Sequence, residues 1–139
     1  MKDVLIASDS ATVREEVAAV LSSRDYTVRY VTSGAAVRPA IVDRAPDLLV
    51  CDFQIGSMGG VAVTLDARLE ESGGRIDHVP VLLLLDRRAD VFLARRSDAD
   101  GFLVKPLDPI RLRRAVAAVI DGGRFADDSY RPAESAAAV

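Results

Sequence analysis

The sequence has no tryptophan, only one cysteine and only two lysines among its 18 basic residues. The lone cysteine, Cys51, cannot form a disulfide within the chain, which fits a reducing compartment. Because nearly all the other basic residues are arginines, a lysine in the interior of the sequence stands out. Lys105 is that lysine.

Two further features are absent: an excess of positive charge and a long hydrophobic run. The formal net charge of −3 argues against a dedicated nucleic-acid surface, which needs clustered Lys and Arg. The longest apolar stretch, residues 79–85, is too short to cross a bilayer. Lys2-Asp3 does not begin a secretory signal. We therefore expect a cytoplasmic protein without a membrane partner and without direct contact to nucleic acid.

The sequence does contain short apolar runs that alternate with amphipathic segments. The runs predict five buried strands, at residues 4–7, 27–31, 47–51, 79–85 and 102–104. Apolar residues recur at helical spacing in the segments that follow, at residues 12–21, 34–44, 61–71, 87–96 and 110–120. Pro39 lies inside the second of these helices and should kink or shorten it. Strands that alternate with helices predict an α/β fold with a parallel sheet covered on both faces.

The length and the end signals indicate one domain followed by a tail. Residues 1–122 are enough for a single domain with a substantial core. Gly122 and Gly123 end the last helix, and residues 123–139 are polar and then alanine-rich, so we expect a disordered C-terminal tail there. That tail is too short for a DNA-binding or catalytic output domain, so we expect a stand-alone domain.

Charged residues follow three of the predicted strands. In a parallel α/β sheet the ligand site lies beyond the carboxyl ends of the strands, where this chain has Asp9, Asp52 and Lys105. Two nearby carboxylates repel each other unless a cation lies between them, and Mg²⁺ accepts such ligands. An aspartate held this way can attack a phosphoryl donor to form an acyl phosphate, and Lys105 would offset charge on the phosphoryl oxygens.

Each of these residues also has an ordinary interpretation. Asp9 or Ser10 could cap the following helix, Asp52 could be a solvated loop residue, and Lys105 could be a surface charge. The joint placement of Asp9, Asp52 and Lys105 after separate strands favours a site over three independent coincidences.

Three segments resemble the receiver domain of two-component response regulators, over about residues 3–121. They are residues 7–14 around Asp9, residues 47–60 around Asp52, and residues 99–107, where a strand leads into Lys105-Pro106. At that Lys-Pro step the family typically has a cis peptide bond, which is uncommon enough elsewhere to be a selected feature. The resemblance implies a flavodoxin-like, doubly wound (βα)5 fold with strand order 2-1-3-4-5.

The resemblance also assigns roles to individual residues. It implies that Asp52 is the phosphoacceptor and that Lys105 contacts the phosphate. Mg²⁺ would be held by Asp9, Asp52 and the backbone carbonyl of Gln54, while Phe102 would change rotamer between states. The partners would be a sensor histidine kinase or phosphotransfer protein and an unknown output protein, with a homodimer through the face of the fourth helix, fifth strand and fifth helix as an alternative contact.

Several positions depart from the family pattern. Ser8 stands where the family has a second acid, which should weaken Mg²⁺ binding. Leu85 stands where a Thr or Ser usually hydrogen-bonds the phosphoryl group, unless the alignment slips by one or two residues. Asp86 follows it and would bring negative charge near an incoming phosphoryl group. We therefore expect a receiver with weakened switching.

Three functions remain open. The first is phosphorelay signalling through Mg²⁺-dependent phosphorylation of Asp52, in a protein that is no enzyme beyond its own phosphorylation and dephosphorylation. The second is a protein-interaction module, a pseudo-receiver, that acts independently of phosphorylation. The third is a flavodoxin-like cofactor binder, disfavoured because the chain has few aromatic residues to stack on a flavin and because Asp9 would repel a phosphate.

Overall fold

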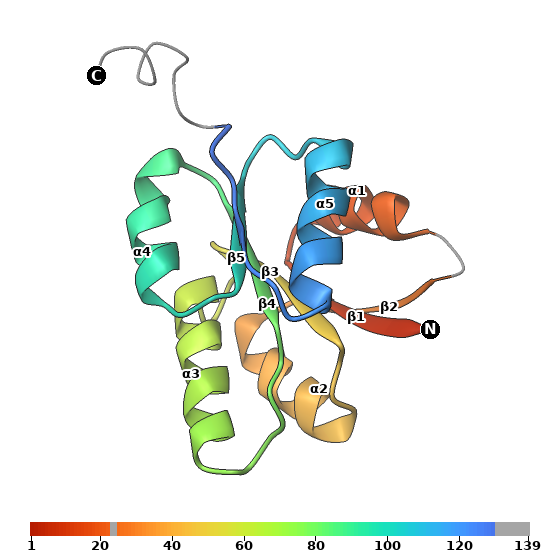
Figure 1. Ribbon diagram of the computed structural model, residues 1–139. Coiled ribbons are helices and arrows are strands. Elements are labelled where there is room, and N and C mark those ends of the chain that lie inside the picture. Colours follow the sequence, from red (N-terminus) through yellow and green to blue (C-terminus); the bar gives the residue numbers. More distant parts are fainter. Residues whose placement is uncertain (23–24, 130–139) are drawn as a thin grey trace.

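A six-stranded parallel sheet forms the centre of the molecule (Figure 1). The computed structural model describes residues 1–22 and 25–129. The strand order is β2-β1-β3-β4-β5-β6, so the predicted order 2-1-3-4-5 is confirmed for the first five strands. The strands are β1 (Lys2–Ala7), β2 (Tyr26–Val31), β3 (Leu48–Asp52), β4 (Val81–Leu85), β5 (Gly101–Val104) and β6 (Phe125–Ala126).

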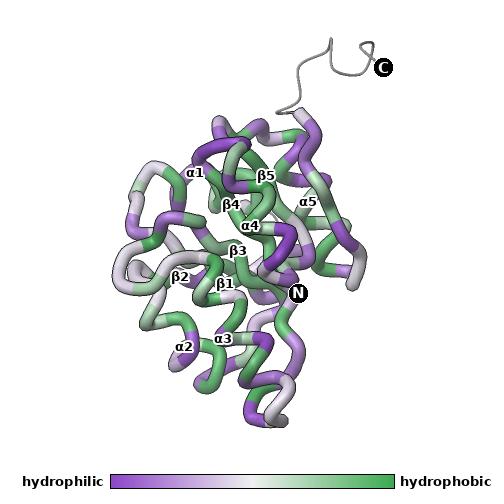
Figure 2. The backbone as a smooth tube through the Cα atoms, turned by 90° about the vertical axis from the view of Figure 1, so that its left-hand side faces the viewer, coloured by the Kyte–Doolittle hydropathy of each residue, from purple (hydrophilic) through white to green (hydrophobic). Residues whose placement is uncertain are grey.

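Five α-helices cover the two faces of this sheet (Figure 1). One face carries α1 (Ala11–Leu21) and α5 (Pro109–Ile120), whose buried residues join one apolar cluster. The other face carries α2 (Val37–Asp43), α3 (Gly60–Ser72) and α4 (Val91–Arg96), which pack on a second cluster. Successive strand residues point to opposite faces, so each central strand contributes to both clusters. The hydrophobic residues are accordingly concentrated in the central strands (Figure 2).

Two of the helices are short and begin with a 3-10 turn. Residues Gly34–Ala36 precede α2, and Arg88–Asp90 precede α4. Pro39 is the third residue of α2, where its missing N–H would have had no partner within the helix. The helix is shorter than the predicted segment 34–44, and Pro39 lies in its first turn, where proline is tolerated.

Residues 125–129 differ from the tail expected to start at residue 123. Phe125 and Ala126 form β6, which pairs in parallel with β5 at the edge of the sheet. Asp127 follows and is buried, with 2% of its surface exposed. A two-residue strand has no periodicity that a sequence pattern can show. The expected disorder of residues 130–139 lies outside the described residues.

No helix within residues 1–22 and 25–129 is long and apolar enough to span a membrane.

Candidate functional site

The registers of the central strands bring several of the predicted site residues together at the carboxyl ends of the strands. Ala7 is level with Cys51, and Leu85 is level with Val104. The residues that follow these positions therefore emerge together, because parallel strands end at a common edge. They are Ser8, Asp52, Asp86 and Lys105.

Asp52 is the buried centre of this group, with 4% of its surface exposed. The Lys105 Nζ donates a hydrogen bond to Asp52 Oδ1 over 2.7 Å. The hydroxyl of Ser8, which is fully buried, donates to Asp52 Oδ2 over 2.9 Å. A buried carboxylate needs such partners, because burial without them is costly. Both oxygens of Asp52 are thus held by the protein itself.

Ser8 therefore has a contact that its sequence position alone did not predict. We expected Ser8 only to weaken Mg²⁺ binding by replacing an acid, whereas its hydroxyl donates a hydrogen bond to the Asp52 carboxylate. The same oxygen accepts a hydrogen bond from the backbone N–H of Ser10. The side chain of Arg14 on α1 donates to the Ser8 carbonyl over 2.8 Å. The loop after β1 is therefore tied to α1 and to Asp52 at once.

Asp9 is exposed and is oriented by the loop after β3. Its Oδ2 accepts a hydrogen bond of 3.0 Å from the backbone N–H of Gly56. A Cβ atom at Gly56 would lie 3.1 Å from the same oxygen, so a larger residue there would require the Asp9 side chain to shift slightly. The cap of α1 is supplied by Ser10, whose hydroxyl accepts from the N–H of Val13. Asp9 is therefore not occupied in capping.

The ammonium group of Lys105 contacts two carboxylates. Besides Asp52, it contacts Asp86 Oδ1 over 3.0 Å. Burial lowers the pKa of Lys105, but the hydrogen bonds to Asp52 and Asp86 and their negative charges outweigh this, so the pKa lies above its ordinary value. The peptide bond to Pro106 is cis, as the resemblance implied. Asp86 was expected only as a repulsive charge, and its pairing with Lys105 was not foreseen.

Leu85 and Phe102 lie in the same buried apolar cluster. Leu85 is the last residue of β4 and is fully buried, and its carbonyl accepts the N–H of Lys105 over 2.8 Å. Its neighbours, Leu84 and Asp86, also lack hydroxyl groups, so a slip of one residue would not supply one. Phe102 is buried beneath the guanidinium of Arg95, whose Cζ lies 5.4 Å from the ring centroid.

The oxygen donors near Asp52 fit Mg²⁺ in kind and are few in number. Mg²⁺ is usually bound by one or two carboxylates together with several waters, and Asp9 and Asp52 provide two. Gln54 is exposed in the turn that follows β3, and the resemblance makes its backbone carbonyl a candidate third ligand. Within residues 1–22 and 25–129 there is no cluster of three or more His, Cys, Asp or Glu groups suited to a metal ion. The replacement of an acid by Ser8 accounts for the short set.

Cys51 lies directly before Asp52 on β3 and is fully buried. Burial, followed by the negative charge of Asp52, raises the pKa of the Cys51 thiol to about 12. The thiolate is the reactive form of cysteine, so this residue is a structural part of the strand.

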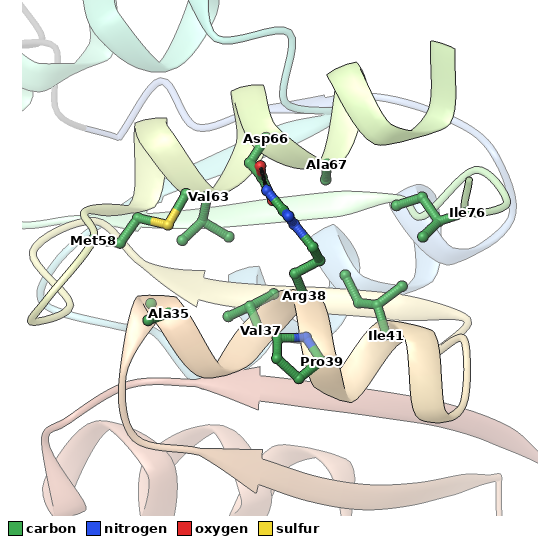
Figure 3. A pocket seen from close by; sticks show the side chains of 11 residues that line it. Ala35, Val37, Arg38, Pro39, Ile41, Met58, Val63, Asp66, Ala67 and Ile76 are labelled. Carbon is green, nitrogen blue, oxygen red and sulfur yellow. Dashed lines mark hydrogen bonds and ion pairs between the residues drawn. The ribbon is translucent and has the colours of Figure 1, made fainter. Parts of the chain in front are cut away.

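A separate pocket of about 260 Å³ lies between α2 and α3 (Figure 3). Its walls are mostly apolar, and the Arg38–Asp66 ion pair crosses it. None of the candidate site residues lines this pocket. The pocket is therefore separate from the group formed by Asp52, Asp86 and Lys105 at the carboxyl end of the sheet.

Comparisons with known proteins identify the family and the fold of this chain. Residues 4–117 match the family model of the response regulator receiver domain. The response regulator protein PmrA of Pseudomonas aeruginosa is 31% identical over 116 residues, which cover 84% of this chain and 51% of PmrA. The DNA-binding response regulator MtrA of Mycobacterium tuberculosis is 26% identical over 117 residues, which cover 83% of this chain and 49% of MtrA.

A solved structure of similar size has the same fold. The putative response regulator from Chloroflexus aurantiacus superposes with a TM-score of 0.78 at 25% identity, covering 86% of this chain and 98% of the other. By contrast, the chain spans about half the length of the curated relatives it matches. The similarity therefore concerns one domain of those longer proteins.

Proposed function

The chain belongs to the receiver domain family of response regulators, and we propose that it accepts a phosphoryl group on Asp52 in a two-component phosphorelay. The observation that carries the proposal is the contact of 2.7 Å between the buried Asp52 carboxylate and the Lys105 ammonium at the carboxyl end of the sheet. This pair combines a nucleophile with a cation beside it.

In the proposed reaction an Asp52 oxygen attacks the phosphorus of the donor. A new oxygen–phosphorus bond forms, and the bond to the leaving group breaks with its electron pair on that group. Lys105 then binds a phosphoryl oxygen in place of the carboxylate oxygen it loses. Mg²⁺, held by Asp9, Asp52 and the Gln54 carbonyl, would supply neutralising positive charge for the transferred group.

Switching in this protein is proposed to be weak. Leu85 occupies the end of β4, is fully buried and carries no hydroxyl to bind the phosphoryl group. A ligand shifts an equilibrium only by the difference in its interactions with the two states. Without that hydrogen bond, phosphorylation shifts the conformational equilibrium of Phe102 and of the surface around it less strongly. The donor is proposed to be a sensor histidine kinase or a phosphotransfer protein, and the output a contact with another protein.

The test is direct phosphorylation in the presence of Mg²⁺. Wild-type protein, Asp52→Asn and Asp86→Asn would be incubated with acetyl phosphate, and the covalent adduct measured by intact-protein mass spectrometry. Asp86→Asn is the matched control, because it removes an acid that contacts the same Lys105. We expect an adduct on the wild type and on Asp86→Asn, and none on Asp52→Asn or after chelation of the metal. An adduct on Asp52→Asn would contradict the assignment.

A second candidate is an interaction module that acts without phosphate. The observation in its favour is that Leu85, which carries no hydroxyl, lies with Phe102 in one buried apolar cluster. Beryllofluoride with Mg²⁺ mimics an aspartyl phosphate and separates the two candidates. Saturable NMR shifts around Phe102 support the phosphorelay, whereas unchanged spectra support the module.

A further inference from the structure

The edge of β5 is covered by the chain's own residues 124–129. The segment runs back along β5 between α4 and α5, as the dark blue trace in Figure 1 shows. Phe125 is level with Gly101, and Ala126 is level with Phe102. The N–H of Phe125 donates to the carbonyl of Asp100 over 3.1 Å. The segment therefore adds to the sheet as an extended strand.

Gly101 makes room for this approach. A Cβ atom on Gly101 would lie 3.0 Å from the carbonyl oxygen of Phe125 and 2.9 Å from a methyl group of Val119. The ring of Phe125 packs against the apolar cluster beneath α5. An apolar contact and a close backbone approach are thus provided for the first residue of the strand.

Asp127 fastens the other end of the segment. Its Oδ2 accepts the N–H of Val104, the last residue of β5, over 2.8 Å. Its Oδ1 accepts the N–H of Ser129 and lies 3.5 Å from Nε of Arg111 on α5. The two N–H donors to this buried carboxylate make charge-assisted hydrogen bonds, which are stronger than neutral ones, and Arg111 adds an ion pair.

The cover is thin. Two surface hollows flank it, one of about 380 Å³ on the side of α4 and one of about 300 Å³ on the side of α5. Phe125 and Ala126 line both of them. The segment is therefore a narrow ridge whose attachment rests on the edge of β5, the site of Phe125 and the site of Asp127.

We propose that the β5 edge is a peptide-binding site that accepts an extended segment of the pattern large apolar, small, acidic, and that residues 124–129 are its resident ligand. An exposed strand edge is a template for pairing with another segment. Here Gly101 leaves room for the backbone of the segment, the cluster beneath α5 selects the apolar residue, and Val104 N–H with Arg111 selects the carboxylate. A resident segment on the same chain competes at high effective concentration.

The site lies next to the candidate phosphorylation pocket. Val104 immediately precedes Lys105, whose ammonium contacts Asp52. A partner segment bound in place of residues 124–129 would therefore contact the strand that carries the cation of the pocket.

The first test is amide hydrogen exchange on the full chain. In Asp127→Ala the N–H of Val104 loses its acceptor, and we expect it to exchange about 10- to 100-fold faster than in the wild type. Asp128→Ala is the matched control, because Asp128 is the exposed neighbour with the same charge. Equal exchange at Val104 in both variants overturns the proposal. Should Asp127→Ala fail to fold, Asp127→Asn keeps an acceptor oxygen, and we expect an intermediate rate.

The second test is binding of the segment from outside. A synthetic peptide with the sequence of residues 124–129 would be titrated into ¹⁵N-labelled Asp127→Ala protein, in which the resident segment is weakened. We expect saturable shifts of the Gly101 and Val104 amides at millimolar peptide, and none in the wild type. The same peptide carrying the Asp127→Ala change should not bind. Failure of the first peptide to bind, or equal binding of both, overturns the proposal.

Discussion

Lys105 offers a sharp test of the site, because its one ammonium contacts a buried and a more exposed carboxylate. The change is Lys105→Met, which keeps an unbranched apolar chain and removes the charge. Asp52 would remain buried with Ser8 as its hydrogen-bond donor. Breaking a fully buried ion pair costs about 3–5 kcal/mol. The Lys105 side chain keeps 21% exposure, so we expect a loss of about 2–4 kcal/mol in the free energy of unfolding.

The same ammonium provides the control through its other partner. The Asp86 side chain is 35% exposed, and ion pairs of this kind contribute about 0–1 kcal/mol. Asp86→Asn should therefore be nearly neutral. The assay is equilibrium unfolding in urea at pH 7 with the metal chelated, followed by circular dichroism.

A double-mutant cycle with Asp52→Asn isolates the pair. In that background the buried charge is gone, so Lys105→Met should cost less than about 1 kcal/mol. If Lys105→Met costs the same with and without the Asp52 charge, the assumed role of Lys105 as the counterion of a buried carboxylate is refuted. The raised pKa of Lys105 also sets a pH dependence. The stabilisation is fully present below the ordinary value of 10.5 and is lost as the pH rises through the higher folded value.

Three further predictions follow from buried positions. Leu85→Thr should lower the free energy of unfolding in urea by about 2–4 kcal/mol, because it replaces a fully buried leucine side chain with a smaller one. The new hydroxyl should nevertheless tighten beryllofluoride binding, measured by titration. Weaker binding would refute the switch argument. The Cys51 thiol, buried and with a pKa raised to about 12, should resist Ellman's reagent in the native protein and react fully in urea; rapid native labelling would contradict this. Gly34→Ala should lower the melting temperature by several degrees, because a Cβ atom there would overlap the carbonyl oxygen of Met58, whereas Gly74→Asn, in open space at positive φ, should be tolerated.

The elements that the sequence predicted well are those whose pattern repeats within one segment. Residues 81–85 and 48–51 are apolar on both faces, and they lie in the fully buried strands β4 and β3. Asp52 and Lys105 were brought together because parallel strands end at a common edge. The family resemblance supplied the cis bond at Pro106, which no periodicity indicates.

The features that the sequence did not predict depend on contacts between distant segments. Asp127 is buried because Val104 leaves an N–H at the sheet edge, a condition that a local pattern cannot show. The partner of the Ser8 hydroxyl depends on its rotamer and on the position of Asp52, 44 residues away. The pairing of Asp86 with Lys105 likewise follows from the ends of two strands, and charge counting alone suggested only repulsion.

The charge of the pocket shows how two of the departures act together. Asp9, Asp52 and Asp86 carry three formal negative charges, and Lys105 carries one positive charge. The family pattern, with two acids after the first strand, has the same balance. Asp86 therefore supplies the negative charge that is missing at Ser8. Its carboxylate contacts Lys105, however, and does not occupy the position of a metal ligand.

In this protein, therefore, the residues that attract a divalent cation from a distance differ from those that can coordinate it directly. The net negative field still draws a divalent cation toward the pocket, and such attraction is screened by salt over about 10 Å at 0.1 M. We expect direct ligation to be reduced, because a serine stands in place of a second acid and its hydroxyl is bonded to Asp52. Mg²⁺ affinity should therefore fall steeply with ionic strength in the wild type, and Ser8→Asp should make it tighter and less dependent on salt. Isothermal titration at two salt concentrations measures both quantities, and an affinity that is independent of salt in the wild type would refute this account of the pocket.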